Sequence, residues 1–281
     1  MALLEGGSWH NQLMTRKAGR RGGAAAEPFD ESIAAALDAA GDRTLAQASR
    51  AGKKNYAQAL SNALARKVAD ALRPEFRGIL PDEHGGGAES RARTKKGFKK
   101  LDVNYSTLEL GLALGVSLKS VNFPEGKANN YAKNVTRVDN ELRAEAEDYH
   151  ARQPFAVLVA LYFVPIDATA NATAKKPSSF GHMVRVLRHR ALRTRIDDPP
   201  SLFEKIYIGL YVPEGPDRGS VSFFDVERAP PWRGFPNREV LGFAEVIQVI
   251  KRTFVERNKT EFVWADRGIT AQDLGMPDET S

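Results

Sequence analysis

The spacing of apolar residues changes character about a third of the way along the chain. Before Pro74 it follows the helical period: the start signal Asp30-Glu31-Ser32 predicts a short helix, and residues 44–72 predict one or two longer helices with a break near Gly52. From residue 101 onward, stretches with the two-residue period of strands alternate with stretches of helical spacing. The chain is therefore predicted to begin with helices and to continue as a mixture of strands and helices.

The second part of the chain predicts a sheet covered by helices. Residues 155–164 are almost entirely apolar and end at Pro165, which is typical of a strand buried on both faces. The other predicted elements are strands over 101–105, 114–123, 206–212 and 221–226 and helices over 129–153, 179–192 and 237–257. This order predicts an α/β or α+β fold, with a mixed central sheet flanked by helices and an N-terminal helical segment before it.

The composition narrows the chemistry that such a fold can carry. The 281 residues include no cysteine, which excludes disulfide scaffolds, thiolate metal sites and cysteine nucleophiles. The five histidines are far apart in sequence, so a bound metal is expected to be a hard cation held by carboxylates. No apolar stretch approaches the roughly 18 residues of a membrane span, and the first residues lack a hydrophobic signal core. These features predict a soluble, cytoplasmic protein with no membrane partner.

Positive charge is concentrated in the first part of the chain. The 41 Lys and Arg against 35 Asp and Glu give a formal net charge of +6. Residues 1–100 hold 18 basic and 11 acidic side chains, whereas residues 101–281 hold 23 and 24. This distribution points toward a polyanion as a partner, and a basic surface that serves only solubility is the alternative.

Three polar residues stand out in the predicted strands. Ser117 and Lys119 project from the same face of the strand 114–123, because side chains alternate along a strand. Asp102 likewise points away from its apolar neighbours in the preceding strand. Two adjacent strands would therefore place Asp102 beside Lys119. Taken singly, each residue has an ordinary alternative as a turn residue, an edge lysine or an ion pair.

The order of these residues resembles the PD-(D/E)XK nuclease superfamily, which includes many type II restriction endonucleases and other phage-defence nucleases. In that family an Asp on one strand and an acid-x-Lys on the next bind one or two Mg²⁺ ions against the scissile phosphate. The lysine helps to orient or polarise the attacking water. Asp102 matches the first acid and Lys119 the lysine. The resemblance implies a restriction-endonuclease-like fold and a Mg²⁺ cofactor, for which Mn²⁺ is expected to substitute.

This sequence departs from the family pattern at two positions. Leu101 stands where proline is common, and Ser117 replaces the second acid. A serine hydroxyl is a poor substitute for a carboxylate as a cation ligand, so the missing acid must come from elsewhere. The resemblance implies Asp102, Ser117 and Lys119 as catalytic residues together with that acid.

The predicted helix 129–153 offers the missing acid. A subgroup of restriction enzymes with a Ser-x-Lys pattern recruits it from the helix that follows. On this helix Glu141 and Glu145 lie one turn apart along one flank of the apolar stripe, with Asp139 on the opposite flank. We expect Glu141 to join Asp102 as the metal ligand, with Glu145 and Glu109 as alternates. The alternative is a solvated amphipathic helix without a functional acid.

Basic residues on either side of these positions are candidates for DNA contacts. One group directly precedes Asp102 and the other lies in the helix 179–192 and its continuation. Such side chains neutralise phosphates or bind guanine edges, and a solvated basic surface is the alternative. The candidate DNA-binding residues are Arg91, Arg93, Lys95, Lys96, Lys99, Lys100, Arg185, Arg188, Arg190 and Arg193.

The resemblance divides the chain into four parts and suggests an activity. The parts are a flexible basic arm over 1–27, a helical segment over 28–88, the nuclease-like core over 89–270 and a tail over 271–281. The expected activity is a Mg²⁺-dependent DNA endonuclease that serves restriction or anti-phage defence. DNA is the expected partner, and a homodimer or a larger defence complex is compatible with this activity.

Two other functions are compatible with the same sequence. The first is a nucleic-acid-binding protein on the same fold that has lost its catalytic acid, with Ser117 marking the loss. The second is a protein–protein interaction module that uses the basic arm and the amphipathic helix 237–257 as contact surfaces. Metal-dependent cleavage would distinguish the nuclease from both.

Overall fold

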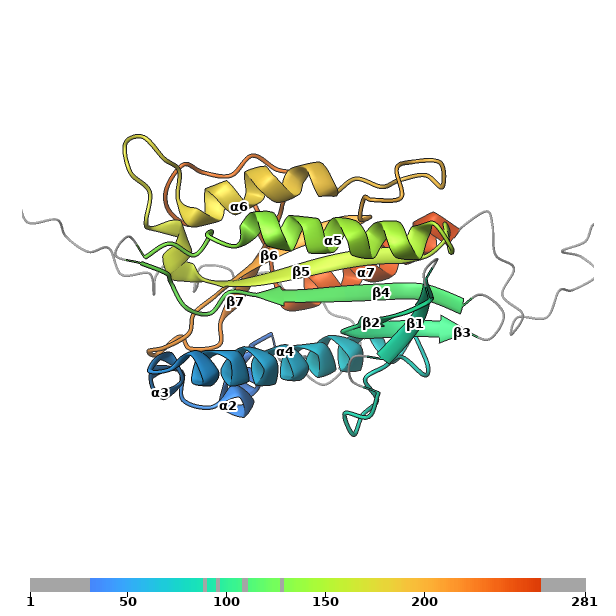
Figure 1. Cartoon of the computed structure of the whole chain (residues 1–281), viewed down its shortest axis with the longest axis horizontal. Helices are drawn as coiled ribbons and strands as arrows, with labels where there is room; N and C mark the ends of the chain where they lie inside the picture. Colours follow the sequence, from blue (N-terminus) through green and yellow to red (C-terminus); the bar gives the residue numbers. More distant parts are fainter. Residues whose placement is uncertain (1–30, 88–89, 95–96, 108–110, 127–128, 259–281) are drawn as a thin grey trace, which may run out of the picture.

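The computed structural model describes residues 31–87, 90–94, 97–107, 111–126 and 129–258 (Figure 1). The predicted basic arm, the tail over 271–281, and the candidate residues Glu109, Lys95 and Lys96 lie outside these ranges.

A six-stranded mixed sheet forms the centre of the molecule, as the sequence predicts. The strand order is β3-β4-β5-β6-β7-β8, in which β4, β5 and β6 run parallel and the other neighbours pair antiparallel. Every residue of β5 is buried, which confirms the prediction of a strand covered on both faces. The strands are β3 (Val103–Thr107), β4 (Gly111–Ser120), β5 (Val157–Pro165), β6 (Lys205–Tyr211), β7 (Val221–Asp225) and β8 (Val240–Leu241).

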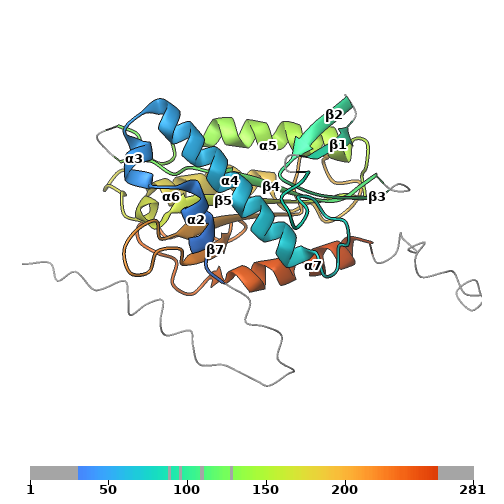
Figure 2. The same cartoon turned by 90° about the horizontal axis from the view of Figure 1, so that it is seen from below.

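Helices cover both faces of the sheet and give the α+β architecture expected from the sequence (Figure 1). One apolar core joins α2, α4 and α7 to one face, and a second core joins α5 and α6 to the other. Figure 2 shows α4 lying across the first face with α7 beside it. The helices are α2 (Ala34–Ala40), α3 (Arg43–Gln47), α4 (Arg50–Leu72), α5 (Val135–His150), α6 (Ser179–Leu187) and α7 (Phe243–Asn258), with 3-10 turns η1 (Ile166–Thr169) and η2 (Arg188–Arg190).

The N-terminal helical segment is part of the main core. In α4 an apolar residue recurs every fourth position, and Leu60, Leu64 and Val68 are buried against the sheet. The predicted break near Gly52 is not observed. The helices separate earlier, between the end of α3 at Gln47 and the start of α4 at Arg50. The Ser49 side chain accepts a hydrogen bond from the Gly52 amide at 2.9 Å and caps α4, so Gly52 lies in the first helical turn.

The basic stretch before Asp102 forms a hairpin, which the sequence pattern did not predict. Strands β1 (Ser90–Thr94) and β2 (Gly97–Leu101) pair antiparallel and contact α5 and β4. Lys99 fixes the hairpin to α5, because its Nζ lies 2.9 Å from the Asp148 carboxylate. The Tyr149 hydroxyl donates to the Lys99 carbonyl oxygen at 2.9 Å. These contacts hold the hairpin against α5. Asp102 directly follows β2, at the bend between β2 and β3.

Two predicted helices begin later than the sequence suggests, and α6, predicted to run to residue 192, already ends at Leu187. α5 begins at Val135 and not near Asn129, because Asn129 has a positive φ of 46°, outside the helical region, and Asn130 pairs with Glu125. α7 begins at Phe243, since the residues just before it pair as β8 with β7. The apolar stripe predicted for α5 is buried, as expected for a helix packed on a sheet.

Candidate functional site

Asp102 lies at the bend between β2 and β3, which interrupts the strand predicted over 101–105. Its neighbour Val103 pairs with Val116 in the antiparallel register, which places Asp102 near Ser117. The Asp102 Oδ2 atom accepts a hydrogen bond of 2.6 Å from the Leu118 amide. This contact holds the carboxylate against β4, and Asp102 remains partly exposed to solvent.

Ser117 and Lys119 project from the face of β4 that α5 covers. Their neighbours Val116 and Leu118 belong to the apolar core on the α4 side, which confirms the predicted alternation. Ser117 is buried, whereas the Lys119 side chain keeps 22% of its surface exposed. A lysine in this position reaches from the covered part of the sheet to solvent.

Glu145 on α5 supplies the carboxylate beside these two residues. The Ser117 hydroxyl donates to Glu145 Oε2 at 3.2 Å, and Lys119 Nζ lies 3.6 Å from the same oxygen. Glu145 is only 8% exposed. A buried carboxylate on a helix therefore occupies the place next to Lys119 where the family pattern has an acid on the strand.

Glu141, the acid expected to join Asp102, lies one turn away from this cluster. Its side chain is 46% exposed, and its Oε1 atom lies 3.6 Å from Arg137 Nε on the same helix. Four residues of helix correspond to about 6 Å along the axis, which carries the Glu141 side chain past Ser117. The geometry favours the alternate Glu145 over Glu141, while Glu109 lies outside the described residues.

The surroundings of Glu145 oppose its ionisation. Burial raises the pKa of the Glu145 carboxyl, the nearby positive charge of Lys119 lowers it, and the negative charge of Asp102 raises it again. The hydrogen bond from Ser117 favours the charged form more weakly. Glu145 thus carries a negative charge only at a cost in free energy, which a cation nearby would reduce.

One oxygen of Glu145 fits the requirement of a cation ligand. Its Oε1 atom is buried and has no hydrogen-bond partner in the described part of the chain. Buried carboxylate oxygens without a partner are uncommon and suggest a missing ion or water. Within the same part of the chain, no group of three or more His, Asp or Glu side chains is placed to hold a metal. A metal here would therefore have Asp102 and Glu145 as its carboxylates, with water and substrate oxygens completing its shell, as Mg²⁺ commonly does.

The basic residues of the hairpin differ in what they contact. Arg91 on β1 and Lys100 on β2 are exposed, which leaves them accessible to a polyanion. Lys99 Nζ donates hydrogen bonds to the Asp148 carboxylate and to the Ala144 carbonyl oxygen, so it attaches the hairpin to α5. Arg93 belongs to β1, but its side chain lies outside the described part.

The arginines of α6 and the segment after it fall into two groups. Arg185 and Arg188 are exposed. Arg190 makes two hydrogen bonds to the Asp139 carboxylate, at 2.9 and 3.1 Å, and thereby links η2 to α5. Arg185 and Arg188 remain candidates for DNA contacts, whereas Arg190 is held in a largely buried ion pair.

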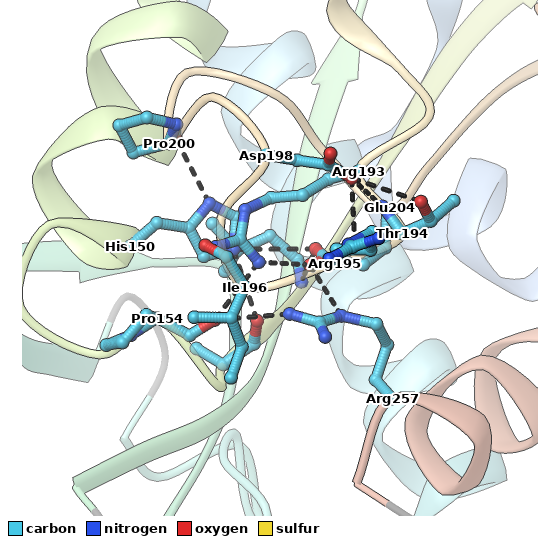
Figure 3. A network of polar contacts seen from close by, with 12 residues as sticks. His150, Pro154, Arg193, Thr194, Arg195, Ile196, Asp198, Pro200, Glu204 and Arg257 are labelled. Atoms are coloured by element: carbon cyan, nitrogen blue, oxygen red, sulfur yellow. Dashed lines mark hydrogen bonds and ion pairs between the residues drawn. The ribbon is translucent and has the colours of Figure 1, made fainter.

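Arg193 is not a surface residue, contrary to the expectation that it contacts DNA. It is 2% exposed and donates to Glu204 Oε1 at 3.1 Å and to the Pro154 carbonyl oxygen at 3.0 Å (Figure 3). Arg257 from α7 reaches the same Glu204 oxygen at 3.4 Å. The basic run around Arg193 does not predict its burial, because its acidic partner Glu204 lies 11 positions further along the chain.

His150 completes this buried network at the end of α5 (Figure 3). Its Nδ1 atom lies 3.0 Å from the Pro200 carbonyl oxygen and its Nε2 atom 3.1 Å from that of Ala156. Glu204 Oε2 is 3.5 Å from Nε2 and also accepts the Leu158 amide at 2.8 Å. The network joins α5, β5, β6 and α7 where β5 and β6 begin, and the side chains of His150, Arg193, Glu204 and Arg257 are at most 8% exposed, which supports a structural role.

Comparison with known proteins identifies no relative of this chain. No protein-family model, no curated protein and no solved structure matches this chain. In the described ranges, no helix combines the length and apolar character needed to cross a membrane.

Proposed function

We propose that this chain is a metal-dependent DNA endonuclease of the PD-(D/E)XK type that hydrolyses phosphodiester bonds. The observation that carries the proposal is the meeting of Glu145 with Ser117 and Lys119, at 3.2 and 3.6 Å, beside Asp102, which lies at the bend between β2 and β3 and accepts the Leu118 amide of β4. An Asp directly before one strand and a lysine on the next resemble the family pattern, and the acid on α5 would take the role of the one missing at Ser117. A cytoplasmic role in restriction or anti-phage defence is part of the proposal.

Asp102 and Glu145 would hold Mg²⁺, or Mn²⁺ in its place. When bound, the ion supplies positive charge that stabilises the phosphate oxygens in the transition state and lowers the pKa of a water molecule. Lys119 Nζ, partly exposed beside Glu145, donates a hydrogen bond that orients the attacking water. Ser117 fixes the Glu145 carboxylate, and the Leu118 amide fixes that of Asp102. The acids are thus preorganised by the protein before substrate binds.

DNA is the proposed substrate because exposed basic residues lie on elements next to these acids. Arg91 and Lys100 belong to the hairpin that leads into Asp102, and Arg185 and Arg188 belong to the segment beside α5. Phosphate contacts of this kind position a duplex without reading its sequence. Cleavage of both strands requires two active sites or one site used twice, and a homodimer or a larger defence complex would supply two.

The decisive experiment compares two glutamates on one helix. Purified protein is incubated with supercoiled plasmid and Mg²⁺, and the rate of nicking is measured for wild type, Glu145→Gln and Glu141→Gln. We expect Glu145→Gln to lose at least about 100-fold in rate and Glu141→Gln to change less than about three-fold. Asp102→Asn and Lys119→Ala should behave like Glu145→Gln. Equal loss in both glutamine variants, or cleavage that survives Asp102→Asn and Lys119→Ala, would refute the site.

A nucleic-acid-binding protein without catalysis is the second candidate. It is favoured by the ion pair between Lys119 and Glu145, since two partners that neutralise each other need no metal. DNA binding with a steep salt dependence, combined with absence of cleavage in Mg²⁺ and in Mn²⁺, would establish this function instead.

A further inference from the structure

A basic groove opens between the N-terminal ends of α5 and α6, on the same face of the sheet as Glu145. Its cavity measures about 720 Å³, which is within the usual range for ligand sites. The basic side chains that line it are Lys133, Lys175, Lys176, His182 and Arg185. Among the described residues that line it there is no Asp or Glu. We refer to this cavity as the α5–α6 groove.

The positive charge of the α5–α6 groove is largely uncompensated. Lys133 is paired with Glu125 at 2.6 Å. Lys175, Lys176 and Arg185 form no ion pair with any described residue, and all three are exposed. Three such cations around one concave site create a local positive potential that attracts an anion.

The segment that carries Lys175 and Lys176 is held in place by hydrogen bonds. The Thr173 hydroxyl accepts from the amides of both lysines, at 3.3 and 3.1 Å. The Trp232 indole donates to the Thr173 carbonyl oxygen at 3.0 Å. On the opposite rim, the Ser179 hydroxyl accepts from the Tyr131 amide at 3.1 Å, which joins α6 to the segment before α5. The rims of the groove are therefore preorganised, which lowers the entropy cost of binding.

The backbone of the two helices adds to the attraction for an anion. Both follow parallel strands of the sheet, so both direct their N-terminal ends toward the carboxyl edge, where α/β proteins commonly bind ligands (Figure 1). Neither helix has an acidic residue in its first turn. The partial positive charge at these helix ends is therefore not neutralised by an acid of the first turn.

We infer that the α5–α6 groove binds a phosphate group, carried either by a nucleic-acid backbone or by a free nucleotide. The backbone case rests on the proposed function. Thr136, which lines the groove, precedes Glu145 by nine residues on α5, and these nine residues span about 14 Å along the helix axis. At about 3.4 Å per base pair, this corresponds to roughly four base pairs of duplex from the scissile phosphate. The groove would then fix the path of the duplex beyond the point of cleavage.

The test removes the two lysines of the groove. Binding of a fluorescent 20-base-pair duplex, of dATP and of inorganic phosphate is measured without Mg²⁺ for wild type and for the double variant Lys175→Ala with Lys176→Ala. We expect affinity for the duplex to fall about ten-fold at 0.1 M NaCl, and the slope of log affinity against log salt to lose about two units. Weaker binding of dATP or phosphate with unchanged duplex binding would also support the groove and assign it to a free nucleotide.

Two further variants make the result specific. The double variant Lys54→Ala with Arg252→Ala removes two exposed charges from α4 and α7, on the other side of the sheet, and should change affinity less than about two-fold. Thr136→Glu places a carboxylate in the groove at the start of α5, where it stabilises the helix yet repels phosphate, so it should weaken binding like the lysine variant.

The inference is overturned if wild-type protein binds none of the three probes, or if the lysine variant and Thr136→Glu bind all of them as wild type does. Because binding is measured without Mg²⁺, a failure to cleave DNA leaves these outcomes unaffected. Conversely, normal plasmid nicking by a lysine variant with unchanged affinities would refute the groove and leave the proposed nuclease site intact.

Discussion

The hydroxyl of Ser117 lies 3.2 Å from Oε2 of Glu145, although the two residues are 28 positions apart in the chain. Ser117 occupies the strand position where the family pattern has its second acid, and Glu145 reaches that position from α5. The carboxylate near Lys119, 3.6 Å away, is therefore provided by a helix and not by the strand itself. The Ser117 hydroxyl donates to this carboxylate and orients it.

Removing this hydroxyl is expected to make the site more dependent on pH. The Ser117 hydrogen bond favours the charged form of Glu145, so Ser117→Ala should raise the pKa of this carboxyl further. The acidic limb of the profile of cleavage rate against pH should move to higher pH, so the loss of rate relative to wild type should be larger at low pH than at high pH. Ser120→Ala, near the end of the same strand, is the control and should leave the profile unchanged.

A second prediction concerns stability in the absence of metal. The pKa of Glu145 is higher in the folded protein than in the unfolded chain, so the folded state binds this proton more tightly. As pH rises from below about 4.5 toward the raised folded pKa, the unfolded state loses its proton first and the free energy of unfolding of wild type should fall. Glu145→Gln cannot ionise and should escape this loss.

Urea denaturation at pH 4 and at pH 8 measures this effect. Subtracting the free energy of unfolding of wild type from that of Glu145→Gln should give a larger value at pH 8 than at pH 4. Glu141→Gln, which alters an exposed carboxylate, is the matched control and should show no such trend. A difference that stays constant with pH would contradict the burial of an ionisable Glu145.

Mg²⁺ should reverse the cost of ionising Glu145. A ligand that binds only the folded state stabilises it by about 2.7 kcal/mol at one hundred times its dissociation constant, and carboxylate ligands bind it in the charged form. Thermal denaturation at pH 8 should therefore show a rise in melting temperature with Mg²⁺ in wild type and in Glu141→Gln. The rise should be absent in Glu145→Gln and in Asp102→Asn. A rise that survives both of these substitutions would place the metal elsewhere.

The sequence was sufficient for most of the sheet and for the strand residues of the candidate site. Period-two alternation places Ser117 and Lys119 on one face, and the continuous apolar run of β5 marks a strand covered on both sides. The sequence does not predict the hairpin of β1 and β2, because basic residues dominate this stretch and hide the strand pattern. Its strand pairing depends on contacts with α5 and β4.

The choice between Glu141 and Glu145 could not be made from a helical wheel. Both residues lie on the same flank of α5, and only the position of the helix along β4 decides which one meets Ser117. That position is set by packing of the apolar stripe against the sheet, which a one-dimensional pattern does not contain. In the same way, the basic run after α6 concealed that Arg193 turns inward while Arg195 stays exposed.

The contrast between Arg193 and Arg195 gives the last prediction. Arg193 is buried and bonded to the buried Glu204, whereas Arg195 is exposed and pairs with the exposed Asp197. Removing one partner of a buried pair leaves an uncompensated charge and typically costs about 3–5 kcal/mol, whereas surface pairs contribute little. Urea denaturation should therefore show a loss of this size for Arg193→Ala and almost none for Arg195→Ala. Below its melting temperature, Arg193→Ala should bind a DNA duplex with wild-type affinity and salt dependence, because a buried guanidinium does not reach phosphate. Weakened DNA binding of Arg193→Ala with unchanged stability would contradict this prediction and would indicate that Arg193 contacts DNA.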